Sequence, residues 1–75
     1  MSNDKLKEAV NVFVNYVLLN EPDKVDRALI DSKLLYIFLE MPKAKRNDMK
    51  KLAPVLFEVE TDDLKAALYQ HYGIE

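Results

Sequence analysis

The chain has 75 residues, and its 11 basic and 13 acidic side chains give a net charge of −2. It contains no Cys and one His, which excludes disulfides and thiolate zinc sites and leaves too few imidazoles for a His-rich metal site. The single Gly argues against the Gly-rich loops that bind phosphates and dinucleotides, so we expect a protein with no cofactor and no enzymatic activity.

The first predicted element is a helix from about Asn3 to Leu19, which Ser2, Asn3 or Asp4 can cap. Apolar residues at i, i+3 and i+4 spacing give this helix one core-facing side. These residues are Leu6, Ala9, Val10, Phe13 and Val17. Residues 10–16 also alternate as a strand would, but the helical start and the sustained period of 3.6 residues favour the helix.

The sequence Asn-Glu-Pro-Asp at residues 20–23 predicts a turn, and Pro22 suits the first turn of a second helix that extends to about Met41. In an alternative interpretation, Asp31 and Ser32 cap a separate short helix and so divide this segment in two. In both cases we expect residues 34–39 to form the centre of the core.

The second helix is apolar on more than one side, so its core-facing side is a separate prediction. The residues predicted to face the core are Val25, Ala28, Leu29, Leu35, Tyr36 and Leu39, with Leu34, Phe38 and Met41 beside them. Ile30 and Ile37 fall instead in a polar stripe with Asp26, Lys33 and Glu40.

Pro42 ends the second helix, and a basic run follows at residues 43–51. Asn47 or Asp48 can cap a short helix inside this run. The residues of that helix predicted to face inward are Met49 and Leu52.

Pro54 predicts a break or a kink after the basic run, and residues 55–59 are either a short helix or extended. The last predicted helix has Thr61 as its capping residue, with acidic residues at 62–63 on the positive end of the helix dipole. It ends at Gly73, the residue type that most often closes a helix.

These elements predict an all-α fold, a compact bundle of four or five short helices in a single domain spanning residues 1–75. No uncharged stretch approaches the roughly 20 residues of a membrane-spanning helix. The N-terminal sequence lacks the basic and apolar regions of a secretory signal. We therefore expect a cytoplasmic protein with no membrane partner.

The basic run carries one candidate binding function. Its cations are Lys43, Lys45, Arg46, Lys50 and Lys51. They could neutralise the phosphates of a nucleic acid, or dock onto an acidic protein surface. Few side chains in the run can bind base edges, and the pI of about 5.3 is far below that of a dedicated nucleic-acid-binding domain. Nucleic-acid binding is therefore the alternative hypothesis, and a solvated surface is the simplest interpretation.

An acidic cluster follows the basic run along the chain. Its members are Glu58, Glu60, Asp62 and Asp63. They lack the Gly turn and ligand spacing of a calcium loop, so they are expected on a solvated helix start or against a basic patch on a partner or a second subunit.

The apolar residues exceed what a small bundle readily buries. We predict that Ile30, Ile37 and Phe38 form an apolar face that binds a protein partner. A chain of this size without disulfides or metals gains stability from association, so a second copy, giving a homodimer, is one candidate partner. The sequence thus predicts a small non-enzymatic interaction or regulatory module with charged rims around an apolar face.

Overall fold

The computed structural model describes residues 3–18 and 25–74 of the chain. Its four α-helices are α1 (Asn3–Val12), α2 (Arg27–Leu35), α3 (Lys43–Leu52) and α4 (Thr61–Tyr72). Three shorter helices are the π-helices η1 (Phe13–Val17) and η2 (Tyr36–Glu40) and the 3-10 helix η3 (Pro54–Phe57). No strand occurs among the described residues, and the predicted all-α bundle is confirmed.

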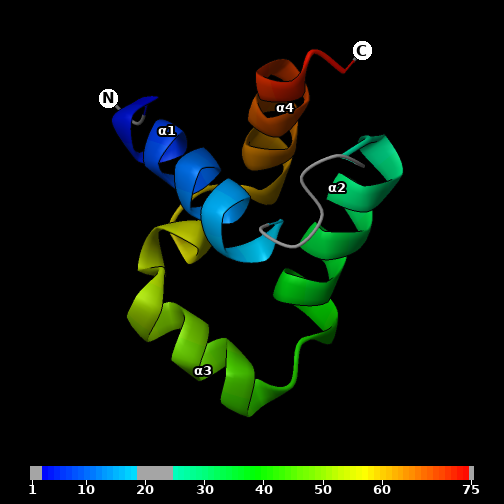
Figure 1. Ribbon diagram of the computed structural model, residues 1–75. Coiled ribbons are helices and arrows are strands. Elements are labelled where there is room, and N and C mark those ends of the chain that lie inside the picture. Colours follow the sequence, from blue (N-terminus) through cyan, green and yellow to red (C-terminus); the bar gives the residue numbers. More distant parts are fainter. Residues whose placement is uncertain (1–2, 19–24, 75) are drawn as a thin grey trace.

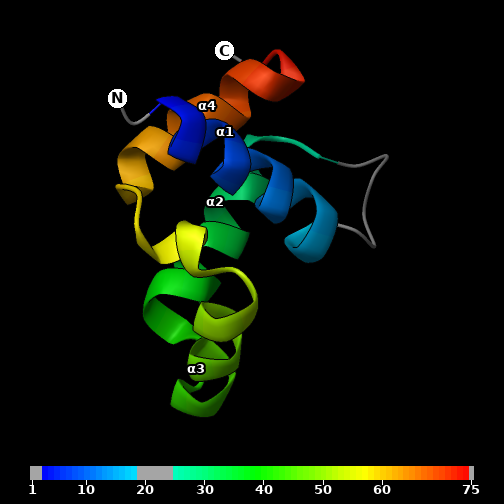
Figure 2. The ribbon, with the colours of Figure 1, turned by 90° about the vertical axis from the view of Figure 1, so that its left-hand side faces the viewer.

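Helix α1 packs against α4 and η3, and α2 packs against α4. Helix α3 lies at the end of the molecule opposite the two termini (Figures 1 and 2), where it packs against η3. None of the residues of α3 is buried. The basic run is therefore a surface helix attached to one end of the bundle.

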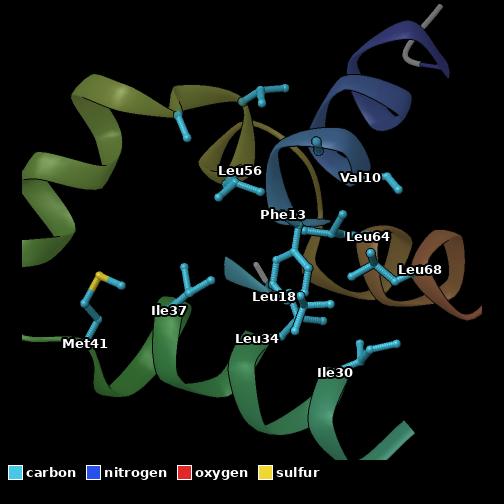
Figure 3. Close-up of a cluster of buried hydrophobic side chains, with 13 residues drawn as sticks. Val10, Phe13, Leu18, Ile30, Leu34, Ile37, Met41, Leu56, Leu64 and Leu68 are labelled. Atoms are coloured by element: carbon cyan, nitrogen blue, oxygen red, sulfur yellow. The ribbon is translucent and has the colours of Figure 1, made fainter. Parts of the chain in front are cut away.

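The core is one cluster of buried apolar side chains from every helical segment except α3. Its members are Ala9, Val10, Phe13, Leu18, Ile30, Leu34, Ile37, Met41, Ala53, Val55, Leu56, Leu64 and Leu68. Phe13 lies in its middle, between side chains of the second helix and of α4 (Figure 3). No polar or charged side chain is buried among the described residues.

Helix α1 continues without interruption into η1, so the predicted first helix is confirmed from Asn3 to Val17. Its last turn is π-helical, and the amide of Leu18 donates to the carbonyl oxygen of Phe13 at 3.1 Å. The predicted end at Leu19, the cap at Ser2 and the turn at residues 20–23 lie outside the described residues.

Helix α2 begins at Arg27, because the Asp26 side chain caps it and accepts a hydrogen bond from the Leu29 amide at 2.8 Å. The helix continues through η2 to Glu40, so the alternative division at Asp31 and Ser32 is wrong. Its predicted start at Pro22 lies outside the described residues.

The predicted core-facing side of this second helix is wrong. The buried residues have heptad-like spacing and are Ile30, Leu34, Ile37 and Met41. Of the predicted set, Ala28, Leu35, Tyr36 and Leu39 face solvent. Leu34 and Met41, which were expected beside that set, are buried, and Val25, Leu29 and Phe38 are partly buried. The segment is apolar on both sides, so its periodicity alone allows two orientations. Packing selects one of them, and the buried stripe points toward Phe13 and Leu64 (Figure 3).

Helix α3 begins directly after Pro42, and the amide of Arg46 donates to the Pro42 carbonyl oxygen at 2.9 Å. Asn47 and Asp48 therefore lie inside the helix, and the prediction that one of them caps it is wrong. The prediction that Leu52 faces inward is also wrong, because 75% of this residue is exposed.

The break before Pro54 is confirmed. Helix α3 ends at Leu52, and Ala53 leaves the helical conformation with φ −141° and ψ 63°. The ring of a proline disfavours the helical conformation of the residue before it. Of the two alternatives for the segment that follows, a short helix is the one observed in η3.

Thr61 was expected to cap the last helix from the position just before it. In the structure Thr61 is instead the first residue of α4, and Glu60 occupies the capping position. Neither makes a capping side-chain hydrogen bond, so the predicted Thr61 cap is wrong. Gly73 ends the helix as predicted, in the left-handed conformation at φ 68°.

A polar cluster joins α2 to α4. The Tyr69 hydroxyl donates a hydrogen bond to Asp31, and Lys65 Nζ lies 3.3 Å from Asp31 Oδ1. The guanidinium of Arg27 lies 4.7 Å from the centre of the Tyr69 ring. The Tyr69 hydrogen bond, followed by Lys65 and Arg27, lowers the pKa of the Asp31 carboxyl below its ordinary value.

This cluster predicts a dependence of stability on pH. Because the folded pKa of Asp31 lies below its unfolded value, its carboxylate stabilises the fold above about pH 4, and this contribution is lost as pH falls through the folded pKa. We expect Asp31→Asn to lower the melting temperature at pH 7, by less than a truncation in the core. The difference from wild type should shrink at pH 3.

Thermal unfolding followed by circular dichroism at the two pH values measures this effect. Glu8→Gln, which removes the charge of an exposed carboxylate on α1 that forms no ion pair among the described residues, is the matched control and should leave the melting temperature nearly unchanged at pH 7. The same deficit for Asp31→Asn at pH 7 and at pH 3 would show that the charge of Asp31 does not act in this way.

Candidate functional site

A groove of about 340 Å³ lies where η1, the second helix and α3 meet. Its apolar walls include Tyr16 from η1, Tyr36 from η2 and Leu52 from the end of α3. Met41 and Met49 also line it. Three segments that are far apart in sequence therefore form one apolar surface, which we call the α3 groove.

The walls of the α3 groove hold three of the five large apolar residues that the described part of the chain exposes. The exposed fraction is 65% for Tyr16 and 75% for Leu52, and Tyr36 is also exposed. Aromatic rings and flexible Met side chains are the residue types that make adaptable binding surfaces. Their gathering at one groove distinguishes it from singly exposed apolar residues, which need no explanation.

The rim of the α3 groove is charged. Lys33 of α2 and Lys45 of α3 contribute two cations, and Asp48 contributes one anion. An apolar centre with a polar rim is the usual composition of a protein interface.

Both π-helical segments contribute to the α3 groove. Tyr16 and Val17 come from η1, and Tyr36 and Ile37 come from η2. A π-turn changes the direction of the side chains that follow it, and such turns are frequent at functional sites.

A second hollow of about 320 Å³ lies beside α4, and it shares no lining residue with the α3 groove. Leu35, Phe38 and Leu39 form its apolar part, and Asp62 lies at its edge. Leu35 and Leu39 are the other two exposed large apolar residues. We call this surface the Leu39 face.

The predicted apolar partner-binding face is wrong for two of its three residues. Ile30 and Ile37 are 0% and 1% exposed, because they belong to the buried stripe of the second helix. Phe38 is half-buried, and its ring packs edge-on against Phe57 with 5.3 Å between ring centres. Phe38 also lines the Leu39 face.

The five predicted cations all lie on α3 but do not share one side of it. Lys45 borders the α3 groove, whereas Lys50 Nζ lies 5.7 Å from the centre of the Phe57 ring. Arg46 is half-buried, and its Nε atom is buried with no hydrogen-bond partner among the described residues. The remaining two, Lys43 and Lys51, are exposed.

The basic helix and the acidic cluster do not pair with each other within the chain. The ion pairs among the described residues are Lys5 with Glu58, at 3.7 Å, and Lys65 with Asp31. Neither involves a cation of α3. The described fold therefore keeps two oppositely charged surfaces apart, and both are exposed to solvent.

The sequence did not predict the α3 groove, because Tyr36 was assigned to the core-facing side of the second helix and Leu52 to the inward side of α3. The signal lies in Tyr16, Tyr36 and Leu52, which are exposed on three segments, and only the fold shows that they converge. Among the described residues, no three His, Cys, Asp or Glu side chains gather as metal ligands would.

No helix in the described ranges combines the length and the apolar character needed to cross a membrane. A comparison of the chain with protein-family models, with curated proteins and with solved structures found no match.

Proposed function

We propose that this protein is a non-enzymatic interaction module that binds a protein through the α3 groove, and that the protein it binds is a second copy of the chain. The observation that carries the proposal is the convergence of Tyr16, Tyr36 and Leu52 on one groove with Lys33 and Lys45 at its rim. Apolar surface that is exposed in one copy is removed from water when another copy covers it.

Two properties of the chain support a second copy as the occupant. The first is size, because a 75-residue chain without disulfides gains stability when it buries further apolar surface. The second is charge, because α3 has five cations and one anion, whereas residues 58–63 have four anions and no cation. Because these two oppositely charged surfaces do not pair within one copy of the chain, each attracts its counterpart on another copy.

Light scattering on a sizing column, over a range of protein concentrations, tests this function. We expect the wild-type mass to rise with concentration and Leu52→Glu to remain a monomer, because the new carboxylate would be desolvated in the interface. Leu52 is largely exposed, so this change leaves the core intact. Asn47→Glu is the matched control, with the same charge change on an exposed position of α3 outside the groove, and it should associate as wild type does.

A wild-type protein that is monomeric at every concentration would refute self-association. Equal association of Leu52→Glu and wild type would show that the α3 groove is not the interface.

Nucleic-acid binding through residues 43–51 is a second candidate, favoured by the exposure of Lys43, Lys50 and Lys51 on a helix with no buried residue. It has less support, because the cations are divided between the groove and the Phe57 side of α3. Titration of a labelled DNA duplex at low and high salt tests it, since binding through phosphates weakens steeply as salt rises.

A further inference from the structure

We infer that the Leu39 face of one copy is the surface that enters the α3 groove of the next, so that the copies associate head to tail. This inference rests on the proposed function and adds the identity of the complementary surface. The Leu39 face comprises Leu35, Phe38, Leu39 and the edge residue Asp62.

The first argument is the position of the two surfaces on one helix. On the second helix, Lys33, Tyr36 and Ile37 line the α3 groove. Leu35, Phe38 and Leu39 line the Leu39 face, and the two surfaces share no lining residue. A single copy can therefore contact two neighbours at once, one through each surface.

The second argument is apolar surface. The described residues expose five large apolar side chains, and all five belong to these two surfaces. If two copies joined through their α3 grooves alone, Leu39, which is 69% exposed, would remain in water. Head-to-tail contact covers both surfaces.

The third argument is charge. The rim of the α3 groove has two cations, Lys33 and Lys45, against the single anion Asp48. Beside the Leu39 face, Asp62 belongs to the acidic residues 58–63, while Lys65 is already paired with Asp31. Two α3 grooves facing each other would bring like charges together, whereas the groove and the Leu39 face are complementary.

A head-to-tail contact is heterologous and does not close on itself in a pair. The wild-type protein should therefore grow beyond a dimer, into a ring or an open chain, as its concentration rises. Added salt should weaken the association, because the charges at the rims are solvent-exposed and are screened.

A complementation experiment tests the arrangement. Leu52→Glu blocks the α3 groove and leaves the Leu39 face intact, whereas Leu39→Lys places a cation on the Leu39 face and leaves the groove intact. Each variant alone should be a monomer. An equimolar mixture should form a one-to-one complex of twice the 8.7 kDa monomer mass and should grow no further, because each partner has one usable surface left.

Gln70→Lys, an exposed position on α4 outside both surfaces, controls for the added charge and should associate as wild type does. Circular dichroism establishes that each variant is folded. If either variant is unfolded, Tyr16→Glu or Leu35→Lys replaces it, since both residues are exposed members of the same surfaces.

Two results would overturn the inference while the proposed function stands. In the first, Leu52→Glu is monomeric but Leu39→Lys associates as wild type does. In the second, the equimolar mixture of Leu52→Glu and Leu39→Lys remains monomeric. If Leu52→Glu itself associates as wild type does, the proposed function fails first, so the two failures are distinguishable.

Discussion

Ile37→Asp should abolish folding, whereas Leu39→Asp, two residues along the same π-helical segment, should leave the protein folded. Ile37 is 1% exposed and Leu39 is 69% exposed. Removing a buried Ile costs about 2–5 kcal/mol, and an unpaired buried carboxylate adds its own desolvation cost. A domain of this length has only about 4–11 kcal/mol of stability in total.

The measurement is urea unfolding followed by circular dichroism at a concentration low enough to keep the protein monomeric. Leu39→Asp should lower the free energy of unfolding by about 0.5 kcal/mol, as is usual for surface substitutions. Ile37→Asp should show no cooperative transition. A folded Ile37→Asp protein beside an unfolded Leu39→Asp protein would mean that the second helix presents the opposite side to the core.

Phe13→Ala should lower the free energy of unfolding by about 3–5 kcal/mol, the range for truncating a buried aromatic residue. Phe13 is fully buried in the middle of the core (Figure 3), so its loss leaves a cavity bordered by α4 and the second helix. The urea midpoint should fall while the dependence on urea concentration stays unchanged, because the surface exposed on unfolding is nearly the same.

Tyr16→Ala is the matched control, because Tyr16 is an aromatic residue of the same π-helical segment and 65% of it is exposed. Its loss should cost about 0.5 kcal/mol in the monomer. Similar costs for the two substitutions would contradict the position of Phe13 at the centre of the core. Tyr16→Ala should also weaken self-association, which Phe13→Ala affects only through stability.

Helix boundaries were predictable where a single residue type restricts the backbone. Pro42 and Pro54 separate the helices at the expected positions, and Gly73 ends the last one in a conformation that other residues rarely adopt. Caps were less predictable, because several neighbouring side chains can accept the same amide hydrogen bond. Thr61 was expected to cap α4 and does not, whereas Asp26 caps α2.

The candidate site was poorly predicted, for a physical reason that Ile37 illustrates. Hydrophobic periodicity identifies a buried side only when the other side is polar. The second helix has apolar residues on two sides and also within its polar stripe, so Ile37 was assigned to the exposed side and Leu39 to the core. In the structure Ile37 is buried and Leu39 is exposed. The same pattern assigned Tyr36 to the core, so it gave no indication that Tyr36 lines the α3 groove.

By itself, the sequence determined the helical class, the ends of most helices and the division of charge between residues 43–51 and 58–63, because these depend on local backbone preference and on composition. Tertiary structure alone decided which stripe of the second helix is buried. It also decided that α3 lies on the surface and that Tyr16, Tyr36 and Leu52 meet. These features depend on contacts between segments distant along the chain, where packing selects among arrangements that local preferences leave equally favourable.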